Sequence, residues 1–147
     1  MLRTVVIAGA LLIGVGAVLA QDAVKDAQAV MKANGKNAGA LAAMVKGEKP
    51  YDQAAVDTAF AQFEQTAKKL PTLFPASMKG MKLEGDYDAS PKVWDDKAGF
   101  EEHVASFAKT VGEAKAKIKD LETLKANFPL LGKQCGGCHE TYRVKHS

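Results

Sequence analysis

The chain has 147 residues, which is enough for one domain with a single core. Its 20 Lys and Arg residues against 17 Asp and Glu give a formal net charge of +3. No basic stretch is interleaved with aromatic residues, so we expect no nucleic acid as a partner. Aromatic residues make up only 7% of the chain and runs of β-branched residues are few, which predicts an all-α domain.

The first twenty residues have the features of a secretory signal peptide. Arg3 precedes an apolar run over residues 5–18, and Val18 and Ala20 provide small residues at the −3 and −1 positions of a cleavage site. We therefore expect a signal peptide at 1–20, a mature domain at 21–147, export to the periplasm and no membrane contact of the mature form. The alternative is an uncleaved anchor, but the apolar run is shorter than the ~20 residues of a spanning helix.

Apolar residues at helical spacing predict two helices in the first half of the chain. The first covers residues 22–45, with Met31 and Gly35 on its buried stripe. The second begins after Pro50 with Asp52 as its N-cap, and it is expected to stop at Pro71.

A long crossover and two more helices follow. Residues 71–91 are rich in Pro, Gly, Ser and Asp, and four apolar side chains there are expected to pack on the helices: Phe74, Met78, Met81 and Leu83. The third helix is expected to start at Ser90 or Pro91, and the fourth is expected to be capped by Asp120. The sequence therefore predicts an antiparallel four-helix bundle with a long crossover between its second and third helices, and a cofactor between facing helices near one end.

The chemistry is concentrated in residues 135–139, which form a C-x-x-C-H motif of the kind that attaches c-type haem. Residues three apart on a helix have Cβ atoms about 5–6 Å from each other. Cys135 and Cys138 can therefore bond to the two vinyl groups of one porphyrin, while the His139 imidazole ligates the iron. Both cysteines continue the apolar seam of the fourth helix, so they are expected to face the bundle interior. We predict one covalently bound haem c.

Other uses of the two thiols fit the sequence less well. A zinc site needs two further ligands, and His103 and His146 do not show ligand spacing. A thioredoxin-like dithiol is found in a βαβ context, which is absent here. A helical interaction module held by a disulfide or by zinc is the third alternative.

The second axial ligand stays open at this level. Only eight residues follow His139 and none is Met, so a sulfur ligand has to come from earlier in the chain. The candidates are Met31, Met44, Met78 and Met81. Met31 lies on the buried stripe of the first helix, where the alternative role of a methionine is to fill a gap in the core.

The motif at the end of a four-helix pattern resembles the class II cytochromes c, the cytochrome c′ family. Residues 31–37, 45–52, 70–75 and 138–143 resemble its low-spin branch, the cytochromes c-556, and the similarity covers essentially the whole mature chain. It implies a periplasmic electron-transfer protein that is not an enzyme, with His139 and Met31 as the two iron ligands.

The resemblance also defines an alternative. In the high-spin branch the iron is five-coordinate and binds small gases such as NO or CO, and an Arg often lies four residues before the position of Met31. Here that position is Ala27, which favours the low-spin branch.

Basic residues near the motif suggest contacts with the cofactor and with partners. Arg143 matches a basic residue common to the family and is expected on the helix face of His139, where it covers the imidazole or pairs with a propionate, unless it is only a solvated cation at a helix end. Lys133, Arg143 and Lys145 flank the motif and can steer an acidic redox partner protein, or simply keep the surface soluble. The protein is expected to be a monomer or a homodimer.

Overall fold

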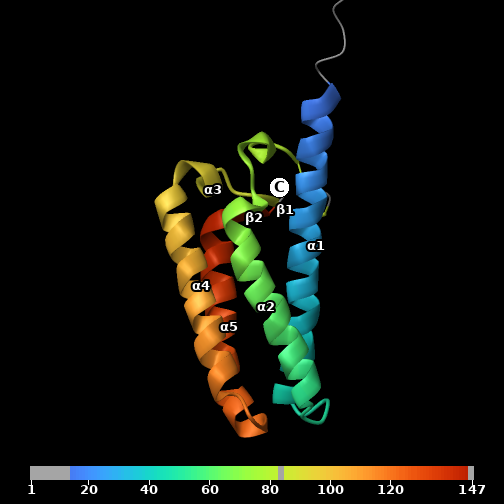
Figure 1. Cartoon of the computed structure of the whole chain (residues 1–147), viewed down its shortest axis with the longest axis vertical. Helices are drawn as coiled ribbons and strands as arrows, with labels where there is room; N and C mark the ends of the chain where they lie inside the picture. The colour runs from blue at the N-terminus through green and yellow to red at the C-terminus, as the bar shows by residue number, and fades with distance from the viewer. Residues whose placement is uncertain (1–13, 83–84, 146–147) are drawn as a thin grey trace, which may run out of the picture.

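The four long helices form an antiparallel bundle, as the sequence predicts. The computed structural model describes residues 14–82 and 85–145. The long helices are α1 (Gly14–Val45), α2 (Gln53–Leu73), α4 (Lys97–Lys117) and α5 (Leu121–Tyr142). Around the bundle, α1 packs on α2 and α5, and α4 packs on α2 and α5 (Figure 1).

Short elements gather at one end of the bundle, where α2 is connected to α4 (Figure 1). They are η1 (Ala76–Met78), β1 (Tyr87–Ala89), α3 (Lys92–Asp95) and β2 (Arg143–Lys145). The two strands pair in antiparallel fashion, with Asp88 opposite Val144. This small β-ribbon was not predicted, and it joins the crossover to the C-terminal segment.

α1 begins earlier than predicted. It starts at Gly14 rather than near residue 22, and Ala20 is buried against the bundle. Residues 14–20 contain no proline, so the helix continues through them. Residues 1–13 of the expected signal peptide lie outside the described residues, and cleavage after Ala20 stays a prediction. Within the described part of the chain, no helix combines the length and the apolar character that a membrane crossing needs.

α2 begins as predicted but ends later. The Asp52 carboxylate accepts hydrogen bonds from the backbone N–H groups of Ala54 (2.9 Å) and Ala55 (3.3 Å), which confirms it as the N-cap. The predicted stop at Pro71 is wrong, since the helix continues to Leu73. Proline removes one helical hydrogen bond, and the burial of Leu70 and Leu73 on either side of it holds the last turn in place.

The predicted third helix is wrong as a single element, because α3 and α4 are separated at Asp96. The Ser90 hydroxyl accepts a hydrogen bond from the Lys92 N–H (3.3 Å), so Ser90 does assist the start of α3. Asp96 then leaves the helical conformation (φ −120°, ψ 59°), and its carboxylate accepts a hydrogen bond from the Gly99 N–H (3.2 Å). Asp96 is therefore a second N-cap, which begins α4.

α5 begins at a capping box. The Asp120 carboxylate accepts a hydrogen bond from the Thr123 N–H (2.8 Å), and the Thr123 hydroxyl accepts one from the Asp120 N–H (3.1 Å). The bonds from Thr123 lower the pKa of the Asp120 carboxyl. The predicted cap is confirmed, and the helix then runs through Pro129 without a break.

The core consists of two clusters, one in each half of the bundle. The first joins all four long helices and includes Leu41, Phe60, Val111 and Leu124. The second includes Val30, Leu70, Phe100 and Tyr142, and the crossover contributes Phe74, Met78 and Met81 to it. This confirms that the crossover packs on the bundle, while Leu83 lies outside the described residues.

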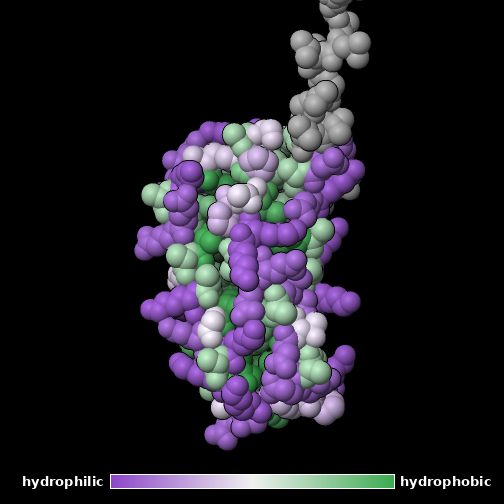
Figure 2. All heavy atoms as spheres, viewed as in Figure 1, coloured by the Kyte–Doolittle hydropathy of each residue, from purple (hydrophilic) through white to green (hydrophobic). Residues whose placement is uncertain are grey.

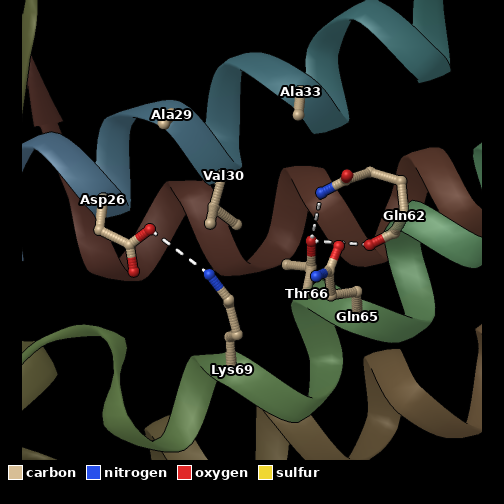
Figure 3. A pocket seen from close by; sticks show the side chains of 8 residues that line it. All are labelled: Asp26, Ala29, Val30, Ala33, Gln62, Gln65, Thr66 and Lys69. Atoms are coloured by element: carbon tan, nitrogen blue, oxygen red, sulfur yellow. Dashed lines mark hydrogen bonds and ion pairs between the residues drawn. The ribbon is translucent and has the colours of Figure 1, made fainter.

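Polar contacts connect α1 with α2. Lys69 pairs with Asp26 (3.4 Å), and the Gln62 amide donates to the Thr66 hydroxyl (3.2 Å) (Figure 3). The Thr66 hydroxyl in turn donates to Asn34 Oδ1 (2.8 Å). Hydrophilic residues cover most of the face seen in Figure 2, with apolar residues visible between them.

Replacing Leu124 by Ala tests the first core cluster. The Leu124 side chain is fully buried, so its truncation leaves a cavity and is expected to lower the free energy of unfolding by about 2–5 kcal/mol. Leu130 lies on the same helix but is 51% exposed, and Leu130→Ala is the matched control, expected to change stability by no more than about 0.5 kcal/mol. Chemical denaturation measures both, and equal losses would contradict the core assignment.

Candidate haem-binding site

α1 and α5 each have a ten-residue segment without a buried residue in the half of the bundle near the crossover. On α1 no residue between Val30 and Leu41 is buried, and on α5 none between Leu131 and Tyr142 is buried. A cavity of about 540 Å³ borders both segments. This volume lies within the roughly 300–1,000 Å³ typical of small-molecule and cofactor sites.

The α5 wall of the cavity carries the C-x-x-C-H motif. Cys135, Cys138 and His139 all line the cavity, and so does Tyr142 one turn later. Cys138 is half-buried and Cys135 is exposed. The two residues therefore border the cavity, whereas continuation of the apolar seam had predicted that they pack in the core. A Cβ at Gly136 would meet no atom within 4 Å, which leaves the backbone of the motif accessible at that position.

The titration behaviour of His139 suits iron ligation, and the two thiols keep their protons. Cys135 is exposed as a whole residue, but partial shielding of its thiol from solvent raises the thiol pKa, and burial raises the pKa of the Cys138 thiol, so both stay protonated at neutral pH. Burial, with the charge of Arg143 as a second cause, lowers the pKa of His139. The imidazole is therefore neutral, and one ring nitrogen keeps a lone pair that can bind a metal.

The α1 wall contains Met31. Among the methionines of the described residues, Met31 alone lines the cavity. Met44 and Met78 are buried but do not line it, and neither does Met81 of the crossover. Gly35, one turn after Met31, also lines the cavity, and a Cβ built there would meet no protein atom within 4 Å. The structure therefore brings Met31 to the same cavity as His139, from a different helix.

The remaining walls are mainly apolar and come from α2, α4 and the crossover. They include Phe63, Leu70, Phe74, Val93, Phe100, Val104 and Phe107. Side chains of this kind exclude water and offer a flat macrocycle a close-packed apolar environment.

Arg143 borders the cavity from the β-ribbon and not from the helix. α5 ends at Tyr142 and Arg143 is extended (φ −125°, ψ 140°), so the expectation that it shares a helix face with His139 is wrong. Pairing of Ala89 with Arg143 in the ribbon favours this extended conformation. The Arg143 guanidinium carbon lies 4.1 Å from the centroid of the Tyr87 ring, a cation–π contact at the edge of the cavity.

Asp88 and His103 are among the polar residues that line the cavity without having been predicted to do so. Asp88 is buried and pairs with Lys82 (3.3 Å). Its strand has only three residues, too few for an alternation pattern to identify its inward side chain. His103 follows Phe100 by three residues and precedes Phe107 by four, so the apolar seam of α4 could have identified it as facing the bundle interior.

Tyr142 connects the end of α5 to the start of α4. Its hydroxyl donates to Asp96 Oδ2 (3.0 Å), and its ring meets those of Phe100 and His103 edge-on, at centroid distances of 5.2 and 5.4 Å. Burial, followed by the hydrogen bond to Asp96 and the charge of that carboxylate, raises the pKa of Tyr142 to about 12. The phenol therefore stays a hydrogen-bond donor over the whole physiological range.

These residues fit a covalently attached haem. Two thiols and a neutral imidazole lie on one helix, a thioether lies on another, and the cavity between them is apolar and of cofactor size. Within residues 14–82 and 85–145, no group of three or more His, Cys, Asp and Glu side chains could hold a metal ion, so the zinc alternative has no support there. A helical bundle with such a site defines the class of c-type cytochromes built on four helices.

Comparison with known proteins gives the family. The sequence profile described as Cytochrome C′ matches residues 22–143. Cytochrome c-556 of Rhodopseudomonas palustris (strain ATCC BAA-98 / CGA009) is 55% identical over 147 residues, which is 99% of each chain. Cytochrome c′ of the same organism is 40% identical over the same share of each chain. The chain belongs to the cytochrome c′ family.

The fold comparison agrees with this membership. The NMR-validated structural model for oxidized R. palustris cytochrome c556 matches with a TM-score of 0.77 and 54% sequence identity, over 86% of this chain and 99% of that one. Proteins of this family carry covalently bound haem c and act as electron carriers or gas binders. The predicted family, fold and cofactor are confirmed.

Proposed function

We propose that this protein is a periplasmic electron-transfer cytochrome, not an enzyme, with His139 and Met31 as the axial ligands of one haem. The observation that carries the proposal is that Met31 of α1 and His139 of α5 line the same cavity. Export through the signal peptide at 1–20 would bring the chain to the compartment in which we expect it to work.

Cys135 and Cys138 would hold the porphyrin through two thioether bonds, each formed by adding a thiol S–H across a vinyl group. Bound haem supplies an iron that accepts and releases one electron by cycling between Fe(III) and Fe(II). The Met31 thioether favours the reduced state and so raises the reduction potential. Because Met31 and His139 come from two helices of one packed bundle, both side chains can stay in place in either oxidation state.

A gas-binding role is the second candidate. Met31 belongs to the partly buried side chains that pack against the second core cluster, so it could serve only as packing and leave one axial position open to NO or CO. The 40% identity to a cytochrome c′ supports this second candidate. Ala27, which is buried and lines the cavity where the high-spin branch often has Arg, favours electron transfer.

The redox partner is proposed to present an acidic surface. Lys133, Arg143 and Lys145 are all exposed and flank the motif in sequence. Positive charge close to the site through which an electron leaves would increase the rate of encounter with an acidic partner.

Replacing each cysteine by serine tests the covalent attachment. In Cys135→Ser or Cys138→Ser one thioether remains, so haem is expected to stay with the denatured chain and the pyridine haemochrome band to shift. The double variant is expected to release all haem on denaturation. Haem staining of a denaturing gel measures this, and covalent haem in the double variant would show that the attachment lies elsewhere.

Met31→Leu tests the second ligand. Leucine nearly conserves the side-chain volume but cannot bind iron, so the sharp low-spin spectrum is expected to become high-spin and to respond to CO. Met44→Leu is the matched control, because Met44 is on the same helix and is buried outside the cavity. An unchanged low-spin spectrum in Met31→Leu would reject Met31 as a ligand.

A further inference from the structure

The last turn of α5 carries His139 and has few bonds of its own. The final carbonyl groups of a helix have no partner further along the helix, and helix ends open more readily than the middle. α5 ends at Tyr142, only three residues after His139. Beside the β1–β2 pairing that follows at Arg143, this end makes two backbone bonds: the Arg143 N–H donates to the His139 carbonyl, and the Ser90 N–H donates to the Tyr142 carbonyl (2.9 Å).

A single carboxylate joins this helix end to the start of α4. Asp96 Oδ2 accepts the hydrogen bond from the Tyr142 hydroxyl (3.0 Å), while Asp96 Oδ1 accepts from the Gly99 N–H (3.2 Å). Tyr142 is only 6% exposed. A hydrogen bond to a charged acceptor is stronger than one between neutral groups, and burial of the tyrosine increases its effect.

Gly99 lies very close to both side chains of this bond. A Cβ at Gly99 would lie 2.5 Å from Asp96 Oδ2 and 2.7 Å from the Tyr142 hydroxyl, closer than non-bonded atoms come. Gly112, on the same helix, would accept a Cβ without any atom within 4 Å. The absence of a side chain at residue 99 therefore matters for one contact, the one between Tyr142 and Asp96.

We propose that Asp96, Gly99 and Tyr142 form a positioning unit, here called the α4–α5 clasp, which holds the last turn of α5 and thereby the His139 imidazole against the iron. Asp96 lies between α3 and α4 (φ −120°, ψ 59°), where its carboxylate bonds both the Gly99 N–H and the Tyr142 hydroxyl. The inference rests on His139 as a ligand under the proposed function, and it does not depend on Met31.

Tyr142→Phe in the haem-loaded protein is the first test. Loss of the hydroxyl removes the bond to Asp96 but keeps the ring packing on Phe100 and His103, so the fold is expected to persist. Amide hydrogen exchange over residues 139–143 should become about tenfold faster, the change that loss of a hydrogen bond to a charged group implies. The reduction potential should shift and the electron paramagnetic resonance signal of the ferric haem should broaden, because the imidazole is no longer held in one orientation.

Tyr51→Phe is the matched control. The Tyr51 hydroxyl donates to Gln53 Oε1 (2.5 Å) near the start of α2, and Tyr51 packs against the first core cluster, away from the cavity. This variant loses the same chemical group, and its potential and resonance signal should match those of the wild type.

Gly99→Ala, with Gly112→Ala as its control, is an independent test. The added methyl displaces the Tyr142 and Asp96 side chains, so Gly99→Ala should reproduce the potential shift of Tyr142→Phe while Gly112→Ala should not. If Tyr142→Phe and Gly99→Ala keep the wild-type potential, resonance signal and exchange rates, the clasp does not position His139. Failure of the proposed function would instead be visible in the wild type: a high-spin, CO-responsive spectrum would remove Met31 as a ligand and leave the clasp in place, and a haem without histidine ligation would remove the basis of both.

Discussion

The dominant constraint on this bundle is that two of its helices have to face each other across a cavity instead of a packed core. α1 and α5 each contain ten consecutive residues of which none is buried, and the cavity of about 540 Å³ borders these two segments. The packing that stabilises the fold is therefore divided into two clusters. The first joins all four helices, whereas the second surrounds the cavity and depends on the crossover and on Tyr142 to complete it.

This division explains why the irregular part of the chain lies where it does. The crossover contributes Phe74, Met78 and Met81 to the second cluster, and its strand β1 pairs with β2 directly after the helix that carries His139. The residues that follow α5 are thus held by the crossover. Under the proposed function, the choice between carrying an electron and binding a gas depends on the opposite wall, where Met31 would either ligate the iron or only fill space.

Much of the fold could be predicted from the sequence because helix periodicity and capping are local. Asp52 and Asp120 were recognised as caps from their positions, and the haem motif from its spacing. The break at Asp96 was not predicted although its bond to the Gly99 N–H is local, and the contact of Asp96 with Tyr142 could not be predicted, since the two residues are 46 positions apart. The extension of α2 past Pro71 likewise depends on the burial of Leu73 against other helices, and the β-ribbon that places Arg143 depends on pairing between distant segments. Which methionine lines the cavity became clear only from the three-dimensional arrangement.

X-ray absorption at the iron edge of the oxidised, haem-loaded protein tests the central claim most directly. Ligation by His139 and Met31 predicts five nitrogen neighbours and one sulfur neighbour at bonding distance, with the sulfur lost in Met31→Leu. An iron with nitrogen neighbours only, or a sulfur that persists in Met31→Leu, would contradict the account.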